Sequence, residues 1–92
     1  MIRSFRHKGL QRLFEQGDAR GVRGDFAAKT ERFLDALHAA ESPQDVDLPG
    51  YRLHRLTGNR AGTWSVVISR NHRITFRFEG ADVYDVDLED YH

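Results

Sequence analysis

The side chains best suited to chemistry are two histidines, an arginine and the acid and phenol near the end of the chain: His54, Arg73, Asp90, Tyr91 and His92. Imidazole has a pKa near neutrality, so it can accept or donate a proton at physiological pH. An arginine beside such groups can stabilise negative charge that develops on a phosphate. If the fold brings these residues together, the set predicts cleavage of RNA without a metal ion. One group would take the proton of the ribose 2′-OH and another would protonate the leaving 5′-oxygen.

A sheet must position these residues, and the second half of the chain predicts one. Its side chains alternate between apolar and polar with a period of two over four segments: 51–56, 63–69, 72–78 and 82–88. In the third segment Ile74 and Phe76 point to one side, and Arg73 points to the other. By the same alternation His54 shares the polar face with Arg73, while Trp64 lies on the apolar face. The last segment places three side chains on the apolar face: Tyr84, Val86 and Leu88.

The apolar face of this sheet needs a cover, and amphipathic helices can supply it. Apolar side chains recur at helical spacing over residues 7–15 and again over residues 25–40. A capped helical turn is expected at residues 42–45 and a short edge strand at residues 2–5. The predicted architecture is a single domain over residues 1–92 with an α+β fold. Two to three helices pack on one face of a twisted, mainly antiparallel sheet.

Composition narrows the class of protein. The 92 residues include no cysteine, which excludes a disulfide framework and a thiolate metal site. The start of the chain lacks the apolar run of a signal peptide, and no window is apolar enough to span a membrane. We therefore expect a cytoplasmic protein that has no membrane partner.

The net charge is zero, but the charges are unevenly distributed. Residues 48–78 carry six arginines and no acid, whereas residues 79–92 carry six acids and no lysine or arginine. Guanidinium groups donate paired hydrogen bonds to phosphate, so a basic sheet face predicts contact with a polyanion. The alternative is that these arginines are ordinary solvent-exposed residues that keep the surface hydrated. The expected RNA-binding residues are Lys8, Arg52, Arg55, Asn71 and Arg77.

Other interpretations of the same residues stay open at this stage. His54, Asp90 and His92 have the side chains of a divalent metal site. They do not follow a close-spaced metal motif, and the nearby arginines would repel a cation, so we expect no metal and no other cofactor. The arginine face alone would suit a non-catalytic RNA-binding module. The acidic segments would suit a regulatory partner of a helix-turn-helix repressor.

The order and spacing of several segments resemble the HigB-type toxins of the RelE superfamily, the toxin halves of bacterial type II toxin–antitoxin pairs. These segments span nearly the whole chain: 2–10, 13–15, 51–56, 58–64, 71–76 and 89–92. The resemblance implies a RelE-like fold and a toxin that enters the ribosomal A site and inhibits translation by cutting mRNA. Such a toxin looks like a metal-independent ribonuclease that uses the 2′-OH as nucleophile. Its functional residues would fall on His54, Arg73, Asp90, Tyr91 and His92, with Asn71 as a weaker candidate.

The resemblance also implies partners, and the sequence departs from the family at one position. The partners would be the ribosome, mRNA and a HigA-type antitoxin whose helix-turn-helix would bring the complex to operator DNA. Several members of the family carry a lysine at the position of Thr57. Loss of one preorganised donor costs roughly 3–4 kcal/mol of transition-state stabilisation. Thr57 therefore predicts weaker cleavage, unless Arg52, Arg55 or Arg73 takes over the role of that lysine.

Overall fold

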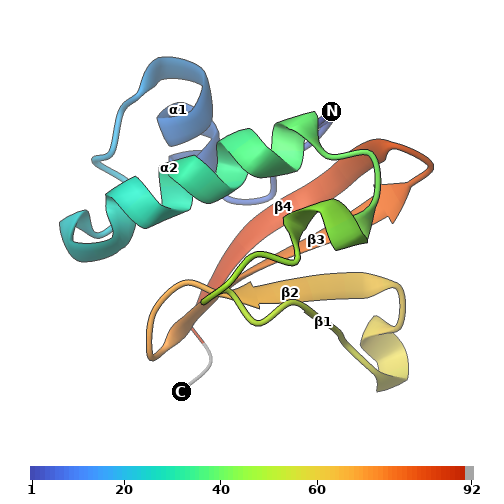
Figure 1. The fold of residues 1–92 in the computed structure, drawn as a ribbon. Coiled ribbons are helices and arrows are strands. Elements are labelled where there is room, and N and C mark those ends of the chain that lie inside the picture. Colours follow the sequence, from blue (N-terminus) through green and yellow to red (C-terminus); the bar gives the residue numbers. More distant parts are fainter. Residues whose placement is uncertain (91–92) are drawn as a thin grey trace.

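The fold consists of helices packed on one side of a four-stranded sheet (Figure 1). The computed structural model describes residues 1–90. Its elements in chain order are α1 (Lys8–Gln16), α2 (Gly24–Ala39), η1 (Pro43–Val46), β1 (His54–Arg55), η2 (Gly58–Arg60), β2 (Thr63–Val67), β3 (His72–Glu79) and β4 (Asp82–Asp90), where η denotes a 3₁₀ helix. The strand order is β1-β2-β3-β4, and every neighbouring pair is antiparallel. The predicted α+β fold is confirmed.

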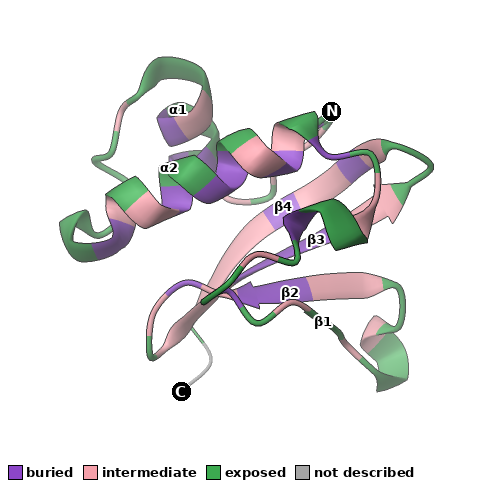
Figure 2. Cartoon of the chain, in the orientation of Figure 1, coloured by how far each residue is buried: buried purple, intermediate pink, exposed green. Residues whose placement is uncertain are grey.

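The core lies between α2 and the sheet. Phe33 of α2 is fully buried, and its ring centroid lies 5.8 Å from that of Phe76 on β3 and 5.2 Å from that of Tyr51. Figure 2 shows the buried residues of α2 on the side turned toward the sheet. Removing these apolar side chains from water is the main source of stability of such a domain. None of the helices described within residues 1–90 is long and apolar enough to cross a membrane.

The first helix begins and ends where its sequence dictates. Nδ1 of His7 accepts a hydrogen bond from the backbone N–H of Leu10 at 3.1 Å, which caps the helix. Gly17 ends it in the left-handed conformation with φ of 69°. Gly9, a poor helix former, packs against the loop that follows the helix. A Cβ at this position would lie only 2.6 Å from the carbonyl oxygen of Gly21. The close approach of the two backbones explains the glycine.

The edge of the sheet beyond β4 is occupied by the N-terminal segment. Ile2 pairs with Val83, and Phe5 pairs with Val86, both in parallel orientation. The backbone N–H of Arg3 donates to the carbonyl oxygen of Val83 at 2.7 Å. The predicted edge strand is therefore present as two isolated bridges. They cover an otherwise open strand edge.

The first predicted strand, 51–56, is much shorter than its alternation suggested. Only His54 and Arg55 form the strand, because Gly50 and Arg52 both have positive φ, 88° and 55°. These two residues turn the chain before it enters the sheet. Arg52 adopts a backbone conformation that is uncommon for a residue with a side chain. The strain lies two residues before His54.

The predicted alternation of the last strand is also wrong in its first half. The register of β3 with β4 shifts between Thr75 and Arg77, and Asp85 opposite this irregularity has φ of 58°. The extra residue moves both Val83 and Val86 onto the core side, where both are fully buried. Tyr84, which we expected on the apolar face, instead lies under the guanidinium of Arg77, 5.7 Å from its ring centroid. A β-bulge re-aims side chains in this way, and alternation alone does not reveal it.

Candidate active site

The free face of the sheet carries polar side chains in rows set by the strand register. Residues directly opposite in antiparallel strands point to the same face. One row crosses all four strands and contains His54, Ser65, Thr75 and Asp87. The next row contains Arg73 and Glu89. His54 and Arg73 therefore share this face, which we call the polar face, as the sequence predicted. They stand on strands two places apart, about 10 Å across the sheet.

His54 is exposed, and one of its ring nitrogens contacts the backbone. Its Nδ1 lies 3.0 Å from the carbonyl oxygen of Arg52. A carbonyl oxygen can only accept a hydrogen bond, so Nδ1 carries the proton in this contact. Nε2 of the neutral ring then has a lone pair available for a proton. The strained backbone at Arg52 is what presents this carbonyl to His54.

Glu89 joins two arginines that come from different parts of the chain. Arg60, in η2, donates from both terminal nitrogens to the Glu89 carboxylate, with Nη1 at 3.0 Å. Arg73 donates from Nε at 3.2 Å and from Nη2 at 3.0 Å to Oε1, and Thr75 donates from its hydroxyl to Oε2 at 3.2 Å. The hydrogen bonds from Arg60, with those from Arg73 and Thr75, lower the pKa of Glu89 to about 2. Glu89 is therefore ionised at any physiological pH.

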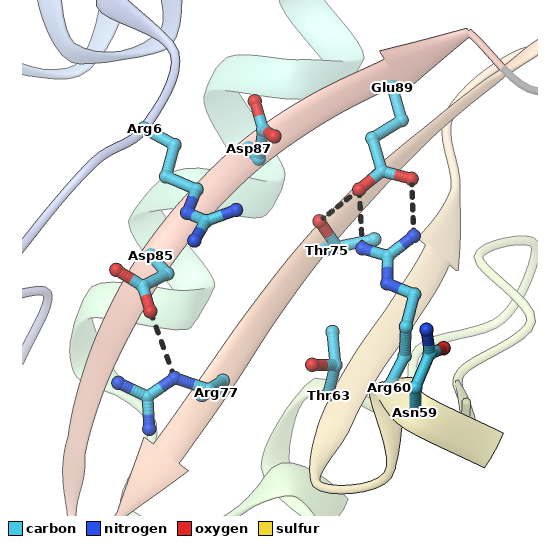
Figure 3. A pocket seen from close by; sticks show the side chains of 9 residues that line it. All are labelled: Arg6, Asn59, Arg60, Thr63, Thr75, Arg77, Asp85, Asp87 and Glu89. Atoms are coloured by element: carbon cyan, nitrogen blue, oxygen red, sulfur yellow. Dashed lines mark hydrogen bonds and ion pairs between the residues drawn. The ribbon is translucent and has the colours of Figure 1, made fainter. Parts of the chain in front are cut away.

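An open hollow of about 240 Å³ lies on the polar face (Figure 3). Its lining residues are Arg6, Asn59, Arg60, Thr63, Thr75, Arg77, Asp85, Asp87 and Glu89. Arg60 and Glu89 stand at one end, whereas Asp85 and Arg77 form an ion pair of 2.9 Å at the other. Three arginines and three acids line the hollow, so its formal charge is zero. The prediction of a basic sheet face needs correction, because β4 places its acids on the face that carries the arginines of β3.

Of the three predicted site residues at the end of the chain, the structure describes Asp90. Asp90 is the Cα partner of His72, and its Oδ2 lies 3.9 Å from Nε2 of that ring. The His72 ring contacts Phe26 of α2, with centroids 4.9 Å apart. Asp90 thus lies beside His72 at the end of β4, and this register points it to the side of the sheet that packs against α2, opposite the polar face that carries His54 and Arg73. Tyr91 and His92 lie outside the described residues, so their predicted convergence with His54 stays a prediction.

The predicted RNA-binding residues lie in different places. Arg77 lies on the polar face, whereas the guanidinium of Arg55 lies over Trp64, 5.2 Å from its ring centroid. Because Arg55 is the Cα partner of Trp64, it points to the opposite face from His54. Asn71 lies in the turn between β2 and β3, and Lys8 opens α1. Arg52 is exposed beside His54. The structure therefore brings only part of this set onto one surface.

Two residues of the polar face were missed by the sequence analysis, Arg60 and Glu89. The alternation of the last strand offered a signal for Glu89, which stands two residues after Asp87. No periodic pattern pointed to Arg60, which lies in a loop between strands. Among residues 1–90, no group of three or more histidine, aspartate and glutamate side chains is arranged to hold a metal ion.

Comparison with known proteins links this chain to a family. The family model described as the RelE-like toxin of type II toxin-antitoxin system HigB matches residues 3–92. The Endoribonuclease HigB of Proteus vulgaris is 41% identical over 92 residues, which is 100% of both chains. Both matches span all four strands of the sheet.

Proposed function

The chain belongs to the RelE-like HigB toxins of type II toxin–antitoxin systems, and from this premise we propose that it is an endoribonuclease that cuts mRNA in the ribosomal A site and so inhibits translation. The observation that carries the proposal is the position of His54. This exposed imidazole has Nε2 available for a proton, and it shares the polar face with Arg73 in a chain that matches the family from residue 3 onward.

The proposed reaction needs only side chains. Nε2 of His54 accepts the proton of a ribose 2′-OH, and the 2′-oxygen forms a bond to the adjacent phosphorus. The bond from phosphorus to the 5′-oxygen breaks, and that oxygen receives a proton from a general acid, for which His92 is our candidate. Arg73 stabilises the additional negative charge on the phosphate in the transition state. The products are a 2′,3′-cyclic phosphate and a free 5′-OH.

The resemblance to the family adds Asp90 and Tyr91 to the proposed site, and the strand register turns Asp90 to the side of the sheet opposite His54. Asp90 is the alternative base for the 2′-OH, since a carboxylate can also accept its proton. Tyr91 would contact the substrate near the cut. Both assignments rest on the resemblance to the family, and each is open to a direct mutational test.

The charge balance of the polar face supports a requirement for the ribosome. The hollow beside Glu89 is lined by three arginines and three acids. Such a surface attracts free RNA weakly, because binding of nucleic acid without sequence preference depends on an excess of positive charge. A ribosome that holds the mRNA in the A site would supply the missing affinity and orient the 2′-OH. We therefore place the toxin in the cytoplasm, where its substrate is.

Membership of a type II system implies an antitoxin, and we propose that it is of the HigA type with a helix-turn-helix. The toxin would then reach operator DNA only through the antitoxin. Co-expression of the two genes should restore the growth that the toxin alone prevents. Normal growth of cells that contain soluble toxin without antitoxin would contradict the proposal.

The decisive experiment is primer extension on an mRNA in a purified translation system. Wild type, His54→Ala, Arg73→Ala and His92→Ala would be compared, with Arg32→Ala on the exposed side of α2 as the control. We expect cuts within A-site codons for wild type and the control. Loss of an acid, a base or a charge-stabilising group should slow cleavage by about 100-fold or more.

The same assay separates the competing functions. Cuts on RNA without ribosomes would keep the nuclease but remove the ribosome from the mechanism, and EDTA added to that reaction tests for a metal ion. A wild-type protein that binds RNA and makes no cuts under any condition would be a binding module. A protein that neither binds nor cuts RNA would instead be a regulatory partner of its repressor.

A further inference from the structure

We propose that Arg60 is a further phosphate-binding residue beside Arg73, and that Glu89 is the positioning residue that holds the two guanidinium groups together. The ligand is a phosphate of the RNA backbone. The inference rests on the proposed function and extends it to a residue outside the predicted site. It follows from the contacts of the Glu89 carboxylate.

The geometry of the cluster is unusually constrained for a protein surface. The Glu89 carboxylate accepts hydrogen bonds from Arg60, Arg73 and Thr75, which lie on η2 and β3. A long arginine side chain on a surface loop normally samples many rotamers. Contact through both terminal nitrogens of Arg60 restricts it to one position on the polar face. Preorganisation of this kind reduces the entropy lost when a ligand binds.

The electrostatics of the cluster favour an anion. Two guanidinium groups repel each other, and the carboxylate between them offsets that repulsion. The sum over Arg60, Arg73 and Glu89 is one positive charge, and the hydrogen bonds from Arg60 contribute most to the low pKa of Glu89. A phosphodiester brings one negative charge, so its binding would neutralise the cluster. On the same strand Asp85 pairs with Arg77, whereas Asp87 lines the hollow with Arg60 and also interacts with its charge.

The arginines remain accessible to a ligand. The side chain of Arg60 is 40% exposed and that of Arg73 is 21% exposed. Arg60 uses its two terminal nitrogens on Glu89, while its guanidinium has five N–H donors in total. Arg60 also lines the hollow of the polar face. A phosphate at the end of the hollow nearest Glu89 would contact Arg60 from the solvent side, next to the carboxylate that also holds Arg73.

The position of Arg60 in the chain addresses the departure at Thr57. Thr57 is the cap residue of η2, and Arg60 is the last residue of that helix. The loop that lacks the lysine implied by the resemblance therefore still delivers a cation to the polar face. Arg60 does not occupy the position of Thr57. It contributes its charge because the fold of η2 brings its guanidinium to Glu89.

The test measures binding in a form that does not require cleavage. The probe is a fluorescent single-stranded RNA with 2′-O-methyl groups, which lacks the nucleophile and cannot be cut. Its affinity is measured by anisotropy at several salt concentrations for wild type, Arg60→Ala, Arg60→Lys and Glu89→Gln. Asp18→Asn is the matched control, because Asp18 also pairs with an arginine and its loss also adds one positive charge, but on the loop after α1.

The expected results have definite signs. Arg60→Ala should weaken binding about fivefold and make the slope of log K against log salt shallower by about 0.7, the value for one phosphate contact on a single strand. Arg60→Lys should restore most of the slope but not all of the affinity, because lysine lacks the planar fork. Glu89→Gln should weaken binding although it raises the net charge. Asp18→Asn should leave binding within about twofold of wild type.

Two outcomes would overturn the inference. An unchanged slope in Arg60→Ala would remove Arg60 from the phosphate contacts. Tighter binding by Glu89→Gln would show that Glu89 acts only as an unfavourable charge. Arg60 is partly exposed, so its variants should fold even if Glu89→Gln does not.

Cleavage in the translation system is scored separately. A wild type that binds but never cuts refutes the proposed function alone, and unimpaired cutting by Arg60→Ala refutes the inference alone.

Discussion

Glu89→Gln should destabilise the fold at neutral pH, and the loss should shrink in acid. The pKa of Glu89 falls from the usual 4.5 to about 2, chiefly through hydrogen bonds from Arg60. That difference corresponds to about 3 kcal/mol in favour of the ionised carboxylate in the folded state. The Glu89 side chain is only 22% exposed, so solvent screening is limited. Glutamine keeps the shape but loses the charge, and we expect a loss of about 2–3 kcal/mol at pH 7.

The pH dependence follows from the sign of the pKa change. The folded-state pKa lies below that of the unfolded chain, so the stabilisation is fully present above pH 4.5 and decreases as the pH falls toward 2. At pH 3 about 1.4 kcal/mol of the 3 kcal/mol should remain. Urea unfolding followed by the fluorescence of Trp64, the single tryptophan, measures this at each pH. Urea is uncharged and does not screen ion pairs, unlike guanidinium chloride.

A matched variant separates the part-buried Glu89 network from an exposed ion pair. The pKa of Asp18 is also lowered to about 2, by hydrogen bonds from Arg20. The Arg20 side chain is 89% exposed, so we expect Asp18→Asn to cost less stability than Glu89→Gln. A difference below about 1 kcal/mol between wild type and Glu89→Gln at pH 7 would refute the reasoning. So would a difference that grows as the pH falls.

Three further predictions concern single positions. Gly9→Ala should destabilise the protein by about 1–3 kcal/mol in urea unfolding, despite the helix propensity of alanine, because the new Cβ would lie 2.6 Å from the Gly21 carbonyl oxygen. Ser65→Ala should raise stability by about 1 kcal/mol in thermal unfolding, because the buried Ser65 hydroxyl has no hydrogen-bond partner among the described residues. Thr57→Lys should speed A-site cleavage about tenfold or more in primer extension, and an unchanged rate would exclude an attenuating role of Thr57.

Local patterns in the sequence were sufficient for the helices and for the shared face of His54 and Arg73. Alternation with a period of two placed His54 and Arg73 on one face, because the side chains of a strand point to opposite faces whatever the partner strand is. The capping box at Ser42 and Asp45 is local in the same sense, and Ser42 N–H donates to Asp45 Oδ2 at 3.2 Å. Resemblance to the family supplied the candidate chemistry, which no periodic pattern contains.

Pairing between distant segments determined the rest. Asp85 lies in a bulge because β4 must match both β3 and the N-terminal segment. The backbone N–H of Asp85 donates a hydrogen bond to Ser4 Oγ in that segment at 2.8 Å. Glu89 contacts Arg60, which lies 29 positions before it in the chain, and Arg73, which lies 16 positions before it. Charge sums along the chain predicted separate basic and acidic regions, yet antiparallel pairing sets them side by side on the polar face. Coulomb energy depends on distance in space, and only the folded sheet determines that distance.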